Sequence, residues 1–198
     1  MTPYEIIMSP FEVWVAPVGE SFPDVDETPA GNWAKLGTNG KLNYSEDGVT
    51  VTHEQTISAH RTLGSTGPLK AARTEENLLI SLTLEDLTME QYAKVLNNVS
   101  VTDVPPGSGT PGHRDITLRQ GGSVASFALL IKGPSPYGDS WAMQYQVPRA
   151  IQNGNPAPVF NKGDAAGLEV EFMALEDPNA STEAERFGKL VAQDADAT

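Results

Sequence analysis

The apolar residues of this chain occur mostly in short runs that alternate with polar residues, and this pattern predicts β-strands. In residues 77–85, NLLISLTLE, the positions Leu78, Ile80, Leu82 and Leu84 share one side of the run. A period of two places one face of a strand in a core and the other face outside it. The other segments expected to form strands are residues 11–16, 41–44, 49–56, 116–118, 124–131, 141–147 and 168–175.

Glycine and proline interrupt these runs and bound the expected strands. The chain has 18 glycines and 15 prolines among 198 residues, and 39% of its residues are hydrophobic. This composition favours strands and turns over long helices and still supplies a core. No internal repeat is visible, and helices do not alternate with strands as they do in parallel sheets. The sequence therefore predicts a mainly β fold, an antiparallel β-sandwich or barrel.

One flanking α-helix is expected over about residues 89–98. Thr88 can act as its N-cap, and Gln91, three residues later, can complete a capping box. Asn97 and Asn98 can end the helix. Apolar side chains at helical spacing predict a stripe that lies on a sheet, formed by Met89, Tyr92, Ala93 and Leu96.

The length of the chain favours one domain, with acidic segments at both ends. Residues 1–175 are expected to form a single β domain that includes an N-terminal arm and an acidic loop, and residues 176–198 an acidic extension. Residues 1–34 carry six acids and no base, and residues 176–198 carry six acids and two bases. Such segments are either solvated tails or contacts between subunits.

The overall charge and the lack of cysteine exclude several classes of function. Lys and Arg number 13 against 26 Asp and Glu, a formal net charge of −13, which argues against a protein that grips nucleic acid through its phosphates. Without cysteine there are no disulfides, thiolate metal sites or cysteine nucleophiles. No apolar run approaches the ~20 residues that span a bilayer, and no signal peptide is evident, so no membrane association is expected.

No catalytic, cofactor-binding or metal site is expected. The histidines at positions 53, 60 and 113 lack the spacing of metal ligands, and no serine stands in a Gly-x-Ser-x-Gly motif. Residues 64–70, GSTGPLK, lack the Gly-Lys-Ser/Thr ending of a phosphate loop. Glu169 and Glu171 share one face of a strand, as a glycosidase could require, but surface strands often show this pattern.

A long exposed hairpin is expected in the first half of the chain. Residues 49–56 begin apolar and end polar, which is typical of a strand that leaves the core. Gly64, Gly67 and Pro68 then mark a turn, with basic residues around it.

Several consecutive segments resemble the tail tube protein (major tail protein) of long-tailed bacteriophages. The resemblance spans residues 44–97 and consists of YSEDGVTVTHEQT, GSTGPLKAARTEE, NLLISLTLEDLT and MEQYAKVLN in this order. The later GDAAGLEVEFMALEDPN also resembles that family. The acidic N-terminal loop and the last 20 residues lie outside the resemblance.

The resemblance implies a structural virion protein and not an enzyme. In that family six subunits form a ring, each lends four strands to a continuous inner β-barrel, and the rings stack into a tube that conducts DNA into the host. It further implies assembly in the host cytoplasm, a place in the virion tail, no cofactor, and DNA that passes without specific binding. The implied partners are the tape measure protein, the tail terminator and distal tail or baseplate proteins.

The resemblance also implies two sets of contact residues. The hairpin is expected to reach a neighbouring subunit or ring, with its bases available to acidic surfaces there. The hairpin residues are Ala59, His60, Arg61, Thr62, Leu63, Gly64, Ser65, Thr66, Gly67, Pro68, Leu69, Lys70 and Arg73. The acids expected to line the channel are Glu54, Glu85, Glu169 and Glu171, although the same alternation would also suit the outer wall of a tube.

Other functions stay open from the sequence. A tail completion or baseplate subunit of the same fold would have a similar sequence. A non-viral carbohydrate-binding β-sandwich could use Trp14, Trp33 or Trp141 to stack on sugars. A hydrolase function would be supported only by the paired carboxylates of Glu169 and Glu171.

Overall fold

The computed structural model describes residues 6–163 and 165–196. This part of the chain is mainly β with a single α-helix, α1 (Met89–Val95), which confirms the predicted fold class. Two short 3-10 helices, η1 (Gly40–Asn43) and η2 (Glu183–Glu185), lie in the connections. The strands are β1 (Glu12–Pro17), β2 (Ala34–Lys35), β3 (Thr50–His60), β4 (Lys70–Leu84), β5 (Val101–Val104), β6 (His113–Ile116), β7 (Ser126–Pro134), β8 (Ala142–Gln152), β9 (Leu168–Ala174) and β10 (Lys189–Ala192).

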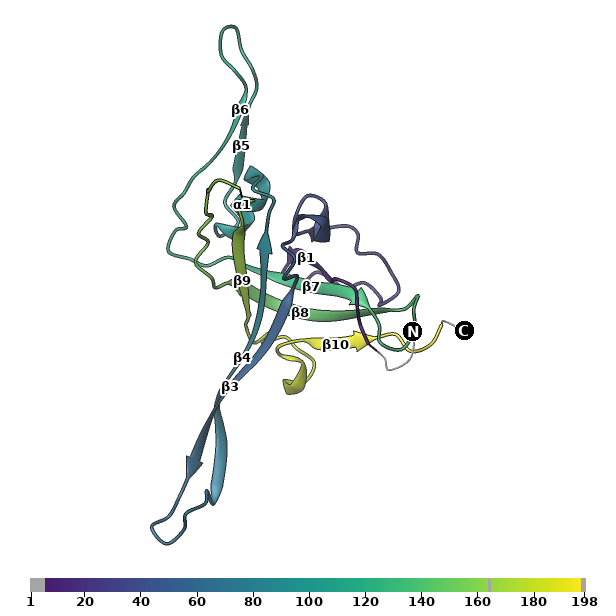
Figure 1. Ribbon diagram of the computed structural model, residues 1–198, viewed down its shortest axis with the longest axis vertical. Coiled ribbons are helices and arrows are strands. Elements are labelled where there is room, and N and C mark those ends of the chain that lie inside the picture. The colour runs from purple at the N-terminus through teal and green to yellow at the C-terminus, as the bar shows by residue number, and fades with distance from the viewer. Residues whose placement is uncertain (1–5, 164, 197–198) are drawn as a thin grey trace.

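One antiparallel sheet contains most of these strands, in the order β2-β1-β7-β8-β9-β4-β3, with β10 also paired to β8. β8 pairs with β10 at residues 143–146 and with β9 at residues 150–152. Pro148 lies between these two stretches, where the register between β7 and β8 shifts. The sheet therefore bends within β8, and β7 and β8 cross β3, β4 and β9 at a steep angle (Figure 1).

The main core lies between the two crossing layers. The alternating leucines and isoleucine predicted for residues 77–85 are all buried on β4. Phe172 of β9 meets Phe127 of β7 edge-to-face, with ring centroids 5.2 Å apart. A second, smaller cluster covers the other face of β1 and β7 and consists of Trp14, Ala16, Trp33, Ala128 and Leu130.

Residues 41–44 do not form the predicted strand. Gly37 and Gly40 have positive φ angles, which bend the chain into the turn of η1. Tyr44 follows it and is buried, with its hydroxyl donating to the carbonyl of Leu36 at 2.9 Å. The same hydroxyl accepts a hydrogen bond from the backbone nitrogen of Val13 at 3.1 Å. Tertiary hydrogen bonding therefore decides the local structure here.

The helix is shorter than predicted, and the predicted capping box is wrong. The side chain of Thr88 makes no capping hydrogen bond, and Asp86 instead accepts the Thr88 backbone N–H at 3.1 Å. Gln91 is buried and turned toward the loop after β2. Of the predicted stripe, Ala93 and Leu96 are buried, but Met89 is exposed. The helix ends earlier than residue 98 because Asn97 and Asn98 adopt positive φ angles.

Two hairpins project from opposite ends of the molecule (Figure 1). The β3–β4 hairpin confirms the predicted exposed hairpin. The second joins β5 and β6, and it forms a separate two-stranded sheet. At the C-terminal side, β10 belongs to the main sheet. The domain boundary at residue 175 stays a prediction.

Candidate assembly surfaces

The outer face of the β9–β4–β3 layer is polar and acidic. In an antiparallel sheet, directly paired residues point to the same side. Leu78 and Ile80 point into the core, so their neighbours on β4 point outward together with their partners on β3 and β9. The outward residues are Thr50, Thr52, Glu54, Thr56, Glu75, Asn77, Leu79, Ser81, Thr83, Glu169, Glu171 and Met173.

Three of the four acids predicted to line a channel share this outer face. Glu54 is paired with Asn77, Glu169 with Thr83 and Glu171 with Ser81. Glu85 directly follows the last residue of β4 and is exposed, and it continues the alternation of outward positions along that strand. The sequence predicted these acids from alternation together with the family resemblance, and the register brings them onto one surface. Whether that surface lines a channel stays a prediction.

This outer face contains four glutamates and no lysine or arginine among its paired residues. Serine and threonine hydroxyls supply most of the remaining polar groups. A groove of about 610 Å³ runs over the end of this face that is farther from the hairpin tip, where Asn153 donates to Oε1 of Glu171 at 2.9 Å. Such a surface repels phosphates and has no basic group to hold them.

The β3–β4 hairpin is paired over its full length and carries the predicted contact residues. Ala59 and His60 end β3, and Lys70 and Arg73 lie at the start of β4. A bulge between Thr56 and Ile57 shifts the register. The remaining residues, Arg61, Thr62, Leu63, Gly64, Ser65, Thr66, Gly67, Pro68 and Leu69, form the connection. Except for half-buried Ser65, every predicted contact residue is exposed.

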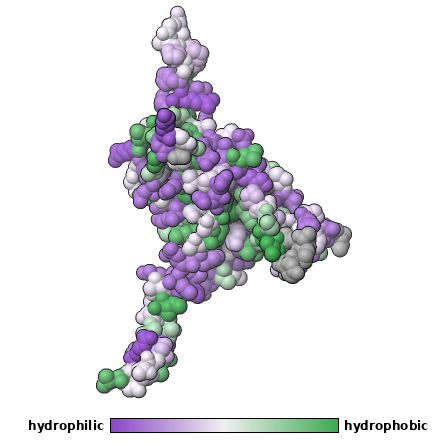
Figure 2. Space-filling view, viewed as in Figure 1, coloured by the Kyte–Doolittle hydropathy of each residue, from purple (hydrophilic) through white to green (hydrophobic). Residues whose placement is uncertain are grey.

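The bases of the hairpin differ in their surroundings. Arg73 donates to Gln55 at 3.0 Å and forms an ion pair with Glu76 at 3.2 Å, so its charge is balanced within the hairpin. Arg61 and Lys70 have no ion-pair partner within the part of the chain that the structure describes. Leu63 is fully exposed and Leu69 is 63% exposed. Figure 2 shows apolar patches on the lower hairpin.

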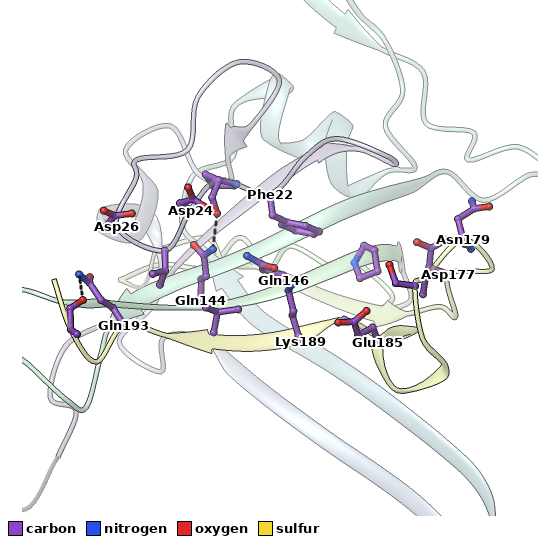
Figure 3. Close-up of a pocket in the computed structure, with 18 of the residues that line it drawn as sticks. Phe22, Asp24, Asp26, Gln144, Gln146, Asp177, Asn179, Glu185, Lys189 and Gln193 are labelled. Carbon is purple, nitrogen blue, oxygen red and sulfur yellow. Dashed lines mark hydrogen bonds between the residues drawn. The ribbon is translucent and has the colours of Figure 1, made fainter. Parts of the chain in front are cut away.

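The two acidic end segments meet at one groove, which we call the acidic groove (Figure 3). Its volume is about 780 Å³, and it lies between the loop at residues 22–26, strands β8 and β10, and residues 177–196. Its acids are Asp24, Asp26, Asp177, Glu185 and Asp196, and its base is Lys189. The acidic bias of both ends is visible in the sequence, but no local pattern indicates that the two ends converge.

Backbone geometry and one side-chain hydrogen bond build the acidic groove. Gly188 has a φ of +105°, and a side chain there would collide with the carbonyl oxygen of Gln146, so glycine allows β10 to reach β8. Gln144 on β8 donates to the carbonyl oxygen of Pro23 at 2.8 Å, which holds the loop over the groove. Oε1 of Gln144 is buried without a hydrogen-bond partner among the described residues.

The structure also bears on the other functions that the sequence left open. Trp14 and Trp33 are buried in the smaller core cluster, so neither offers a ring face to a sugar. Trp141 is half-buried and donates to Asp196 at 2.8 Å. Among the described residues, no three His, Asp or Glu side chains are arranged to hold a metal ion. Over the same residues, no helix is long and apolar enough to span a bilayer.

The chain is similar to chains of solved structures. No protein-family model matches the chain, and no curated protein matches it. Among solved structures, the chain is similar to a chain of the sheath-tube complex of an extracellular contractile injection system, PVC, determined by cryo-EM in the extended state. The TM-score is 0.45 at 12% sequence identity, over 97% of this chain and 93% of that chain.

Proposed function

We propose that this chain is a structural subunit that assembles into hexameric rings, which stack as the tail tube of a bacteriophage. The tube would conduct DNA into the host, with no catalytic step and no cofactor. The observation that carries this proposal is an acidic sheet face, free of bases, that ends in a long open edge strand. The sequence resemblance to tail tube proteins supports the same reading.

The open edge provides a means of assembly. β3 is the last strand in the sheet order, so one edge of its 11 residues has no strand partner within the described chain. Four strands lie side by side where β8 meets β9, followed by β4 and β3. An exposed edge of this length pairs readily with another chain, and closing the sheets of several copies into a barrel removes every open edge.

The acidic face suits the inside of such a barrel. The phosphates of a passing DNA meet glutamates and hydroxyls, and they find no lysine or arginine among the outward residues of β3, β4 and β9. DNA therefore slides without being held. In this proposal the tape measure protein occupies the channel before DNA, and the tail terminator and distal tail or baseplate proteins bind the two ends of the tube.

Electron microscopy of the purified chain at high concentration tests the proposal, with light scattering to give the mass of the oligomer. We expect rings of six copies and hollow rods. A chain that stays monomeric would overturn the proposal. Rings that never stack would instead favour a tail completion or baseplate subunit of the same fold.

A pair of proline variants tests the role of the β3 edge. Successive N–H groups of a strand point to opposite edges of that strand. One of the variants His53→Pro and Glu54→Pro therefore removes a donor on the open edge of β3, and the other removes a donor that faces β4. We expect the open-edge variant to keep the circular dichroism spectrum of the parent and to lose ring formation. Normal rings from a folded open-edge variant would exclude the edge-pairing mechanism.

A further inference from the structure

We infer that the hairpin tip, residues 59–70, of one copy docks into the acidic groove of a second copy. This inference rests on the proposed function and specifies one contact within it. The β3–β4 hairpin projects away from β8 and β10 (Figure 1), and these two strands border the acidic groove, so such a contact is heterologous. Heterologous contacts propagate into rings or filaments.

The hairpin tip exposes basic and apolar side chains that have no partner within the hairpin. Between Gln55 and Thr74 the chain contains three bases and no acid, and only Arg73 is paired within the hairpin. Leu63 and Leu69 expose their side chains to water on a two-stranded ribbon that has no core beneath it. Exposed leucines beside unpaired bases are typical of a contact site.

The acidic groove is complementary to the hairpin tip in charge and in chemistry. Five carboxylates and one lysine line it, while Phe22, Val25 and Val191 supply apolar surface. Arg61 and Lys70 can therefore pair with carboxylates while Leu63 covers the apolar part. The buried and unpartnered Oε1 of Gln144 adds an acceptor for an incoming N–H donor, once the side chain turns toward the groove.

Other grooves of the described structure fit the tip less well. The groove on the acidic sheet face is lined mainly by polar groups, with Leu82 and Val170 pointing into the core. An apolar groove beside Phe127 and Phe172 contains Lys94 and no acid. A third is lined by Lys35, Lys41 and Lys132 against the single acid Glu12, and it would repel the tip. The acidic groove alone among these combines several carboxylates with apolar surface.

The hairpin is long enough to reach past its own subunit. The paired residues from Gln55 to His60 are exposed and project the tip by roughly 20 Å at about 3.3 Å per residue. The docking contact has a charged component, so it is expected to weaken as ionic strength rises.

Disulfide trapping tests this contact directly, because the chain has no native cysteine. Thr66→Cys places a thiol on the hairpin tip, and Ser181→Cys places one on the wall of the acidic groove. The two variants are mixed under assembly conditions and oxidised. We expect a disulfide-linked dimer from the mixture and little from either variant alone. Ser123→Cys is the matched control, since it is exposed and lies outside the acidic groove, and its mixture with Thr66→Cys should give no dimer above background.

Charge exchange supplies an independent measurement. Arg61→Glu with Lys70→Glu reverses the charge of the tip, and Asp24→Lys with Asp26→Lys and Glu185→Lys reverses the charge of the groove. Each of the two multiple variants alone should lose rod formation but keep its circular dichroism spectrum. An equimolar mixture should regain rods, because each reversed surface then finds a complementary one.

The outcomes separate the contact from the assembly as a whole. Rods that form normally, without a Thr66–Ser181 crosslink and without sensitivity to charge reversal, would overturn the docking contact and leave the tube proposal standing. A parent chain that stays monomeric would overturn the tube proposal and this contact with it.

Discussion

Oε1 of Gln91 lies 3.0 Å from the backbone nitrogen of Gly37, although 54 residues separate the two in sequence. Gln91 is buried on α1, and Gly37 lies in the loop that follows β2. The bond fastens the helix to the loop and satisfies a buried donor. We expect Gln91→Ala to lower the free energy of unfolding by ~1–3 kcal/mol, because the N–H of Gly37 loses its partner. Urea unfolding measures this change.

Met89→Ala is the matched control for Gln91, because Met89 lies on the same helix and is 41% exposed. Its effect should stay within about 0.5 kcal/mol. Equal losses for both variants would contradict the role given to the Gln91 side chain.

The hydroxyl of Tyr44 joins β1 to the loop before η1 through Val13 and Leu36. Tyr44→Phe leaves both backbone groups without this partner and should cost ~1–3 kcal/mol. Tyr137→Phe, at an exposed position, should be neutral in the same unfolding experiment.

Burial raises the pKa of Tyr44 from 10.0 to about 12, with a smaller contribution from the nearby charge of Glu12. The folded state therefore favours the neutral phenol. Its contribution to stability is complete below pH 10 and is lost as the pH rises through about 12. We expect Tyr44→Phe to reduce the loss of stability over this range, measured by urea unfolding at increasing pH. An unchanged pH dependence would contradict the assignment.

Asp86 accepts hydrogen bonds from the backbone nitrogens of Thr38 at 2.7 Å and Thr88 at 3.1 Å. Burial acts to raise the pKa of Asp86, but the hydrogen bonds from both threonines outweigh it and hold the pKa below 3.8. The stabilisation is present above the unfolded value and is lost as the pH falls through the folded one. Asp86→Asn should therefore lose stability at neutral pH and show a smaller further loss in acid than the parent, by urea unfolding.

Phe172 closes the core between the two layers against Phe127. Phe172→Ala should lower the free energy of unfolding by ~3–5 kcal/mol, because a large cavity opens between the sheets. Phe160→Ala removes the same side chain from an exposed position and should change stability little. Comparable losses would show that the contact between the layers is not a main source of stability.

The position of the acidic sheet face within an assembly can be read by thiol labelling. Thr83→Cys lies on that face, and Ser108→Cys lies at the tip of the β5–β6 hairpin. In free subunits both thiols should react with a long polyethylene-glycol maleimide. In assembled rods only Ser108→Cys should react with it, while a small maleimide should still reach Thr83→Cys through the open channel. Equal labelling by the long reagent would place the acidic face outside the channel.

The sequence by itself determined the features that depend on near neighbours. The period-two pattern of residues 77–85 located the core strand, since alternation is a local property of a strand. The polar second half of β3 and the glycines after it predicted the exposed hairpin. Alternation also indicated which side of its own strand each of Glu54, Glu169 and Glu171 occupies, and the pairing of β3 and β9 with β4 places the three on one face.

Only the tertiary structure decided what depends on contacts between distant residues. Gln91 follows Thr88 at the spacing of a capping box, yet a buried donor 54 residues away binds its side chain instead. Lys41 and its neighbours form a 3-10 turn because Tyr44 is held by Val13 and Leu36. The acidic groove arises where the two ends of the chain meet across β8 and β10, and no local pattern encodes that meeting, because it depends on the strand order of the sheet.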